Sequence, residues 1–201
     1  MPPMPPVTKA LMLICTAVFC VDQLLRSFIA LPIWFALWPV ASGQFFPWQP
    51  VTYAFLHGDV LHLFFNMLGM WMFGAELERL WGPRRLLTFL LAAVLSAAAC
   101  QLLVTWLTHS FVPTVGASGG LFGLLLAYGM LFPNRTIMPL FPPIPMKART
   151  FVAVFGGLEL LQGVFGPAGV AHFAHLGGML GGWLMIRFWR GQAPFPSRRR
   201  R

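Results

Sequence analysis

The chain has 201 residues, of which 58% are hydrophobic and only 9% are charged, and its mean hydropathy is +0.73. Soluble domains carry about 25% charged residues and disordered chains have low hydrophobicity, so both classes of protein are excluded. The net charge of +9 comes from Arg and Lys residues that cluster at the ends of apolar runs, a pattern typical of membrane topology rather than of nucleic-acid binding. At about 20 residues per span, this length holds roughly five to seven membrane helices.

Apolar runs bounded by charged residues, Gly or Pro predict six membrane helices. The first extends over residues 10–31, with Asp22 and Arg26 forming an i, i+4 ion pair near its end. The segment 32–56 is rich in Pro and Trp, cannot hold a straight helix and is expected to lie at the membrane interface. The other five helices are expected at residues 60–78, 86–107, 118–132, 150–165 and 170–189.

Six helices place both chain ends on one side of the membrane, and most of the loop Arg and Lys residues fall on that same side. Because positively charged loops stay inside, we expect both termini to be cytoplasmic. Residues 1–9 then form a short cytoplasmic N-terminus, residues 10–190 one membrane domain, and residues 191–201 a basic cytoplasmic tail. We expect this tail to contact anionic lipids and not nucleic acid.

The predicted fourth helix, residues 118–132, is too short to cross a membrane. At 1.5 Å per residue it spans roughly 22 Å, against about 30 Å of hydrocarbon. Its start at Ser118 is therefore expected below the outer surface, with the preceding residues from Thr114 descending into the membrane. Non-helical backbone survives at that depth only when it is buried in protein or lines a water-filled cavity, so the short helix predicts a site.

Polar residues on three predicted helices come out at one depth. Measured from the inner end of each helix, Ser118, His175 and Asn66 lie roughly 21, 18 and 20 Å up. His62 lies one turn from Asn66 on the same helix face. The sequence therefore places three polar side chains about two-thirds of the way across a ~30 Å core, with His62 one turn above them.

Small residues predict which helices touch. Two helices carry GxxxG pairs, which let backbones approach closely: Gly119 with Gly123, and Gly178 with Gly182. Packing these two faces would bring Ser118 next to His175, a nucleophile beside its general base. Asn66, His62 and the backbone N–H groups at the start of the fourth helix are suitable donors for an oxyanion.

Other interpretations compete for single residues. A Ser or His in a membrane helix often serves only as an interhelical hydrogen bond. A zinc site is disfavoured because only Asp59 lies near His57 and His62, and we expect no metal and no cofactor. Glu159 with Gln162 suggests an ion path, but Glu159 is one acid with no basic partner in its own helix, so packing is the favoured interpretation.

In combination these residues resemble the rhomboid family of intramembrane serine proteases, over residues 10 to 190. Three motifs in chain order carry the resemblance: His57-x4-His62-x3-Asn66, Gly116-Ala117-Ser118-Gly119, and Ala174-His175-x2-Gly178-x3-Gly182. Glu78-x3-Gly82 and the long Trp-containing loop after the first helix add to it. The resemblance implies an all-α, six-helix membrane bundle with a partly submerged fourth helix. One departure is Trp48-Gln49, where the family often has Trp-Arg.

The family pattern also implies roles for the motif residues. Ser118 would be the nucleophile and His175 the base, as a dyad with no acid. His62, Asn66 and the Ser118 backbone N–H would form the oxyanion hole. His57 matches a structural histidine. Residues expected to support or line the same site are Gly116, Gly119, His172, Gly178 and Gly182.

The implied function is an intramembrane serine endopeptidase of the bacterial inner membrane. Its substrates would be single-span or polytopic membrane proteins, entering through the gap beside the fifth helix and the loop after the first helix and cut near the extracytoplasmic side. One alternative is a rhomboid-like protein that binds membrane helices without cutting them. A small transporter is a second alternative, but it predicts paired internal repeats, and the two halves of this sequence share no motif.

Overall fold

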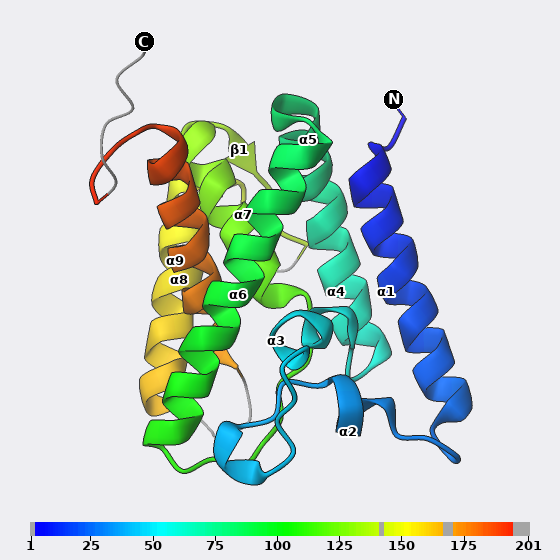
Figure 1. Cartoon of the computed structure of the whole chain (residues 1–201). Helices are drawn as coiled ribbons and strands as arrows, with labels where there is room; N and C mark the ends of the chain where they lie inside the picture. The colour runs from blue at the N-terminus through cyan, green and yellow to red at the C-terminus, as the bar shows by residue number, and fades with distance from the viewer. Residues whose placement is uncertain (1–2, 141–142, 167–170, 195–201) are drawn as a thin grey trace.

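The computed structural model describes residues 3–140, 143–166 and 171–194, and it is a bundle of helices (Figure 1). The bundle consists of α1 (Pro6–Leu25), α4 (Val60–Gly69), α5 (Ala75–Trp81), α6 (Pro83–Leu107), α7 (Ser118–Leu131), α8 (Ala148–Phe165) and α9 (His172–Trp189). The shorter elements are α2 (Leu31–Phe35), η1 (Val40–Ser42), α3 (Gln49–Thr52), η2 (Tyr53–Phe55), the π-helical turn η3 (Met70–Gly74), β1 (Thr136–Ile137) and β2 (Met146–Lys147). α1 begins and α9 ends at one end of the bundle, while α2 and α3 lie toward the other (Figure 1).

The all-α membrane fold is confirmed, and all the predicted helices have counterparts. Four helices of the described residues are long and apolar enough to cross a membrane: α1, the continuous helix Val60–Trp81, α6 and α8. α7 is apolar but shorter, and α9 contains His172, His175 and Arg187, which lower its hydropathy. Six crossings therefore stay a prediction. The expected start of the last helix, residue 170, lies outside the described residues.

The first helix differs from its prediction at both ends. α1 begins at Pro6, because Pro is well suited to the first helical turn, and it ends at Leu25. The predicted ion pair is wrong: Asp22 is buried, Arg26 is exposed, and Oδ1 of Asp22 has no hydrogen-bond partner among the described residues. An i, i+4 spacing brings two residues to one face of a helix. Here the helix ends at Leu25, so Arg26 does not continue the buried face on which Asp22 lies.

The start of α1 is held by a carboxylate from the end of α5. Glu78, which is 3% exposed, accepts hydrogen bonds from the backbone N–H groups of Val7 (2.9 Å) and Thr8 (2.7 Å) and from the Thr8 hydroxyl (2.7 Å). The first N–H groups of a helix have no partner within the helix, and a negative charge there is favourable. This contact explains structurally why Glu78 is buried.

Residues 32–56 form no straight span, as predicted, and Gln49 holds this segment together. The Gln49 side chain is fully buried. Its Oε1 accepts from the Trp38 N–H at 3.2 Å, and its Nε2 donates to the carbonyls of Gln44 (3.0 Å) and Trp34 (3.3 Å). The glutamine in the Trp48-Gln49 pair is therefore a structural residue of this loop.

α6 and α9 pack on α7 through very small residues. A Cβ placed on Gly178 would collide with the carbonyl oxygen of Gly119, and one on Gly182 would lie 3.1 Å from the Cα of Gly123. A Cβ on Gly119 would lie 2.6 Å from that of Ala97 on α6. The predicted contact between the two GxxxG faces is therefore present, and it fixes the separation of α7 and α9.

The loop before α7 turns back into the bundle, so that α7 begins inside it (Figure 1). Leu37 and Thr114 exchange backbone hydrogen bonds of 2.9 and 3.0 Å, and the Gly116 N–H donates to the Tyr53 carbonyl at 2.9 Å. α7 itself has 14 residues, or roughly 21 Å. The loop between α7 and α8 contains a short antiparallel hairpin, β1 with β2, which the sequence did not predict.

Candidate active site

Ser118 and His175 meet where two helices begin. Ser118 is the first residue of α7, and His175 lies in the first turn of α9. Nε2 of His175 lies 2.8 Å from Oγ of Ser118, a hydrogen-bonding distance. Ser118 is partly exposed and the His175 side chain is 14% exposed, so both groups remain accessible. The pair predicted from depth and glycine packing is thus brought into contact.

Gly116 forms the floor of the site between Ser118 and His62. Its φ of +123° lies in a region that only glycine adopts readily. A Cβ at this position would lie 2.6 Å from Nε2 of His62 and 3.6 Å from Oγ of Ser118. The absence of a side chain therefore leaves the space that a substrate carbonyl would need between these two atoms.

His62 of α4 faces the same space, and Asn66 lies one turn further along that helix. Asp59 caps α4 by accepting from the His62 backbone N–H at 2.8 Å. The Gly58 N–H points to Nδ1 of His62 at 3.4 Å, which leaves Nε2 of that ring as the donor facing Gly116. Asn66 is 4% exposed, and its Nδ2 donates to the His62 carbonyl at 2.8 Å. Their role as oxyanion donors stays a prediction.

His57 is buried, at 4% exposed, and its ring lies edge-on to His62 with centroids 5.2 Å apart. Burial, with a smaller contribution from His62, lowers the pKa of His57 to about 4. The imidazole is therefore neutral at neutral pH. Its position behind His62 agrees with the structural role that the resemblance implies.

Phe122 is a site residue that the sequence reasoning missed. Its ring stacks on His175 with centroids 4.4 Å apart and an interplanar angle of 7°. Phe122 lies four residues after Ser118, on the same face of α7, and this spacing could have identified it. The stacking restrains the plane of the imidazole that faces Ser118.

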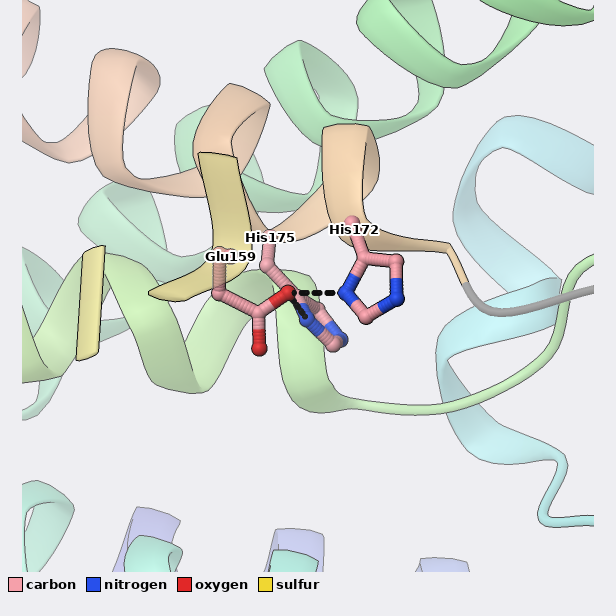
Figure 2. Close-up of side chains that lie close together, drawn as sticks. All are labelled: Glu159, His172 and His175. Atoms are coloured by element: carbon pink, nitrogen blue, oxygen red, sulfur yellow. Dashed lines mark hydrogen bonds and ion pairs between the residues drawn. The ribbon is translucent and has the colours of Figure 1, made fainter. Parts of the chain in front are cut away.

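Glu159 was interpreted as a packing residue, and the structure shows otherwise. Figure 2 shows one oxygen of its carboxylate facing two histidines of α9: Oε2 lies 2.7 Å from Nδ1 of His172 and 2.8 Å from Nδ1 of His175. The interpretation considered partners only within the same helix, whereas both partners are on the neighbouring one. Counted from the start of α8 at Ala148, Glu159 lies roughly 16 Å up, near the depth of His175, whereas the start predicted at residue 150 gives only roughly 14 Å.

Glu159, His172 and His175 are also the described residues that could hold a metal ion, because their ligand atoms lie within 4.8 Å of one another. Zinc binds nitrogen and oxygen ligands at about 2.0–2.2 Å, which in a tetrahedral site keeps two ligand atoms roughly 3.3 Å apart. The 2.7 and 2.8 Å separations here are shorter and are those of hydrogen bonds.

The fold and site define a class: a polytopic membrane protein with a serine and a histidine joined inside a helix bundle. The sequence comparisons narrow that class. The family model described as Rhomboid domain matches residues 44–191. The chain therefore belongs to the rhomboid family.

Relatives from two bacterial genera match nearly the whole chain. The protein named Rhomboid protease GlpG from Yersinia pestis (strain Pestoides F) is 30% identical over 191 residues, covering 92% of this chain. The protein of the same name from Klebsiella pneumoniae subsp. pneumoniae is 32% identical over 185 residues, covering 90% of this chain. The chain spans 62% of the length of each of these curated relatives.

Proposed function

We propose that this protein is an intramembrane serine endopeptidase that cleaves transmembrane segments of membrane proteins. The observation that carries the proposal is the 2.8 Å contact between Nε2 of His175 and Oγ of Ser118, inside a bundle of membrane helices. The names of the bacterial relatives support the same activity.

The chemistry follows from the positions of these atoms. Nε2 of His175 accepts the Ser118 proton as Oγ attacks the substrate carbonyl, and the resulting imidazolium gives that proton to the leaving amine. The negative oxygen of the tetrahedral intermediate would lie near Gly116, within reach of Nε2–H of His62 and of the unpaired N–H groups at the start of α7. In the second half of the reaction, His175 takes a proton from water as the water attacks the acyl-enzyme, and it then returns that proton to Oγ of Ser118.

A groove between α4, α7 and α8 offers a path for the substrate. It has a volume of about 640 Å³ and is lined almost wholly by apolar side chains, among them Phe65, Met72 and Phe155. Phe122 belongs both to this groove and to the stack on His175, so the groove leads to the site. An apolar transmembrane helix would fit such a surface. The groove also lies beside α8, where the substrate is predicted to enter.

The chain is an integral membrane protein, as its family and its apolar helices indicate. The bacterial relatives support a location in the inner membrane. We infer that the shared end of α1 and α9 faces the cytoplasm. The junction of α5 and α6 lies at that end (Figure 1), and it carries Arg79 in the last turn of α5 and Arg84 and Arg85 in the first turn of α6. The start of α7 would then open toward the extracytoplasmic side. Of the basic tail expected to contact anionic lipids, 191–201, residues 195–201 lie outside the described part of the chain.

The test is cleavage of a panel of single-span substrates by purified protein in proteoliposomes, comparing wild type with Ser118→Ala and His175→Ala. We expect both variants to lose cleavage while keeping the thermal unfolding temperature, and a fluorophosphonate probe to label wild type but not Ser118→Ala. Ser27 is an exposed serine after α1, and Ser27→Ala is the control, which should retain both cleavage and labelling. Binding of substrate helices by wild type without cleavage or labelling would favour the non-proteolytic alternative.

A further inference from the structure

We propose that Glu159 is a positioning residue for His175, so that the catalytic pair works as a chain of three groups, Ser118, His175 and Glu159. This inference rests on the proposed protease function. It differs from the dyad without an acid that the resemblance implies, and it assigns a chemical role to the carboxylate that contacts His175.

The first argument is the tautomer of His175. An ionised carboxylate can only accept hydrogen bonds, and a neutral imidazole carries one N–H. Because Oε2 of Glu159 lies 2.8 Å from Nδ1 of His175, the ring proton lies on Nδ1. Nε2 is then the unprotonated nitrogen, and it is the one that lies 2.8 Å from Oγ of Ser118. Glu159 thus selects the tautomer that can act as a base.

The second argument is that the carboxylate is itself held in place. Nδ1 of His172 donates to the same Oε2 at 2.7 Å, and His172 is 6% exposed. Glu159 comes from α8, whereas both histidines come from the first turn of α9. Two N–H donors compensate part of the cost of placing a charge in a membrane protein, because charge-assisted hydrogen bonds are about twice as strong as neutral ones.

The third argument is the orientation of the ring. The Phe122 ring lies against one face of His175, which leaves the imidazole free to slide or rotate in its own plane. The in-plane bonds at opposite corners of the ring, to Glu159 and to Ser118, remove that freedom. When His175 takes the serine proton, the carboxylate also lies next to the positive charge that forms.

The experiment compares Glu159→Gln and Glu159→Asp with wild type in proteoliposomes, measuring kcat and KM for one cleaved substrate and the rate of fluorophosphonate labelling. We expect Glu159→Gln to lower kcat about 10²-fold with KM nearly unchanged, because the change affects proton transfer and not substrate binding. Labelling should slow in parallel, and Glu159→Asp should restore part of kcat because it restores the charge. Gln162→Ala, an exposed polar residue one turn further along α8, is the matched control and should leave both rates unchanged.

The possible negative results can be distinguished from one another. If wild type neither cleaves nor labels, the proposed function falls and the role of Glu159 falls with it. If wild type cleaves, Ser118→Ala does not, and Glu159→Gln retains full kcat, only the role of Glu159 is overturned. If Glu159→Gln does not fold, Glu159→Ala decides: a lower kcat at unchanged KM supports the proposal, and wild-type kinetics overturn it. Loss of wild-type activity in a chelator, restored by zinc, would assign the three side chains to a metal instead.

Discussion

Gly178 of α9 lies directly against the backbone of Gly119 of α7, with no room for a side chain between them. Ser118 precedes Gly119, and His175 lies one turn before Gly178, so this contact sits immediately beside the Ser118–His175 hydrogen bond. The distance between Ser118 and His175 is therefore set by how closely two helix backbones approach. Any residue that separates α7 from α9 here should separate these two side chains as well.

Gly178→Ala tests this relationship. The added methyl group would meet the Gly119 carbonyl, which is backbone and cannot move aside as a flexible side chain could. We expect a loss of stability of about 1–3 kcal/mol, as for other overpacked cores, and loss of fluorophosphonate labelling at temperatures where the variant is still folded. Thermal unfolding in detergent and labelling of the same samples measure both effects.

Gly157→Ala is the matched control, because a Cβ at Gly157 of α8 has nothing within 4 Å. Alanine is the better helix former by about 1 kcal/mol, so this variant should be as stable as wild type or more stable. Normal labelling of Gly178→Ala, with an unchanged unfolding temperature, would contradict the proposed dependence of the site on this contact.

His62 and Asn66 should affect the rate more than the affinity. Removing one oxyanion donor typically costs about 10²–10³ in kcat, so His62→Ala and Asn66→Ala are each expected to lower kcat with little change in KM. Kinetics of single-span substrate cleavage measure this split. Leu61→Ala, at a 67% exposed position of the same helix, is the control. Full kcat in both single variants and in the double variant would make the two residues structural.

The Ser118–His175 contact could be predicted because it depends on helix lengths and on the spacing of glycines, and both can be counted in a sequence. Helix length and residue count set the depth of Ser118 and His175, and the glycine spacing predicted which faces approach. Glu159 was missed for a different reason. Its contact with His172 and His175 depends on how α8 is rotated about its own axis against α9. Gly156 and Gly163 of α8 face α9, but they meet its side chains and not its backbone, and they form no GxxxG pair that would have indicated this rotation.

Charge spacing along one helix proved a poor guide for the same physical reason. Asp22 and Arg26 have a favourable i, i+4 spacing, yet one is buried and the other exposed. Spacing places two residues on neighbouring parts of a helix surface, but the packing of the helix decides what that surface faces. Phe122 was missed for the opposite reason: its i, i+4 spacing from Ser118 places it on the same helix face, but nothing in the spacing alone indicates that this face stacks on His175.

His57 predicts a pH dependence of stability. Its pKa in the folded protein is about 4, below the value near 6.5 of an exposed histidine, so the unfolded chain binds the proton more readily. Stability is therefore fully present above pH 6.5 and falls as the pH drops toward 4, by up to about 3 kcal/mol. Thermal unfolding of wild type and His57→Phe across this range measures the effect. The variant should lose less stability than wild type on acidification, and equal losses would contradict the assignment.

The last prediction concerns where and how easily a substrate is cut. The backbone of an intact helix is shielded by its own hydrogen bonds, so a transmembrane segment must unwind before Ser118 can reach a carbonyl. Unwinding in hydrocarbon leaves polar groups unsatisfied at several kcal/mol each. Glycine and proline lower this cost, since they disfavour a helix by about 1 and 3 kcal/mol relative to alanine.

We therefore expect substrates with Gly or Pro below the outer interface to be cut faster than matched substrates with Ala at those positions. The scissile bond should lie in the outer part of the span, because α7 extends roughly 21 Å from Ser118 to its inner end. Mass spectrometry of the two fragments locates the bond, and the Ala-substituted substrate of equal length is the control. A cut in the cytoplasmic half of the span would contradict the proposed orientation of the bundle, and equal rates for the two substrates would show that unwinding does not limit the reaction.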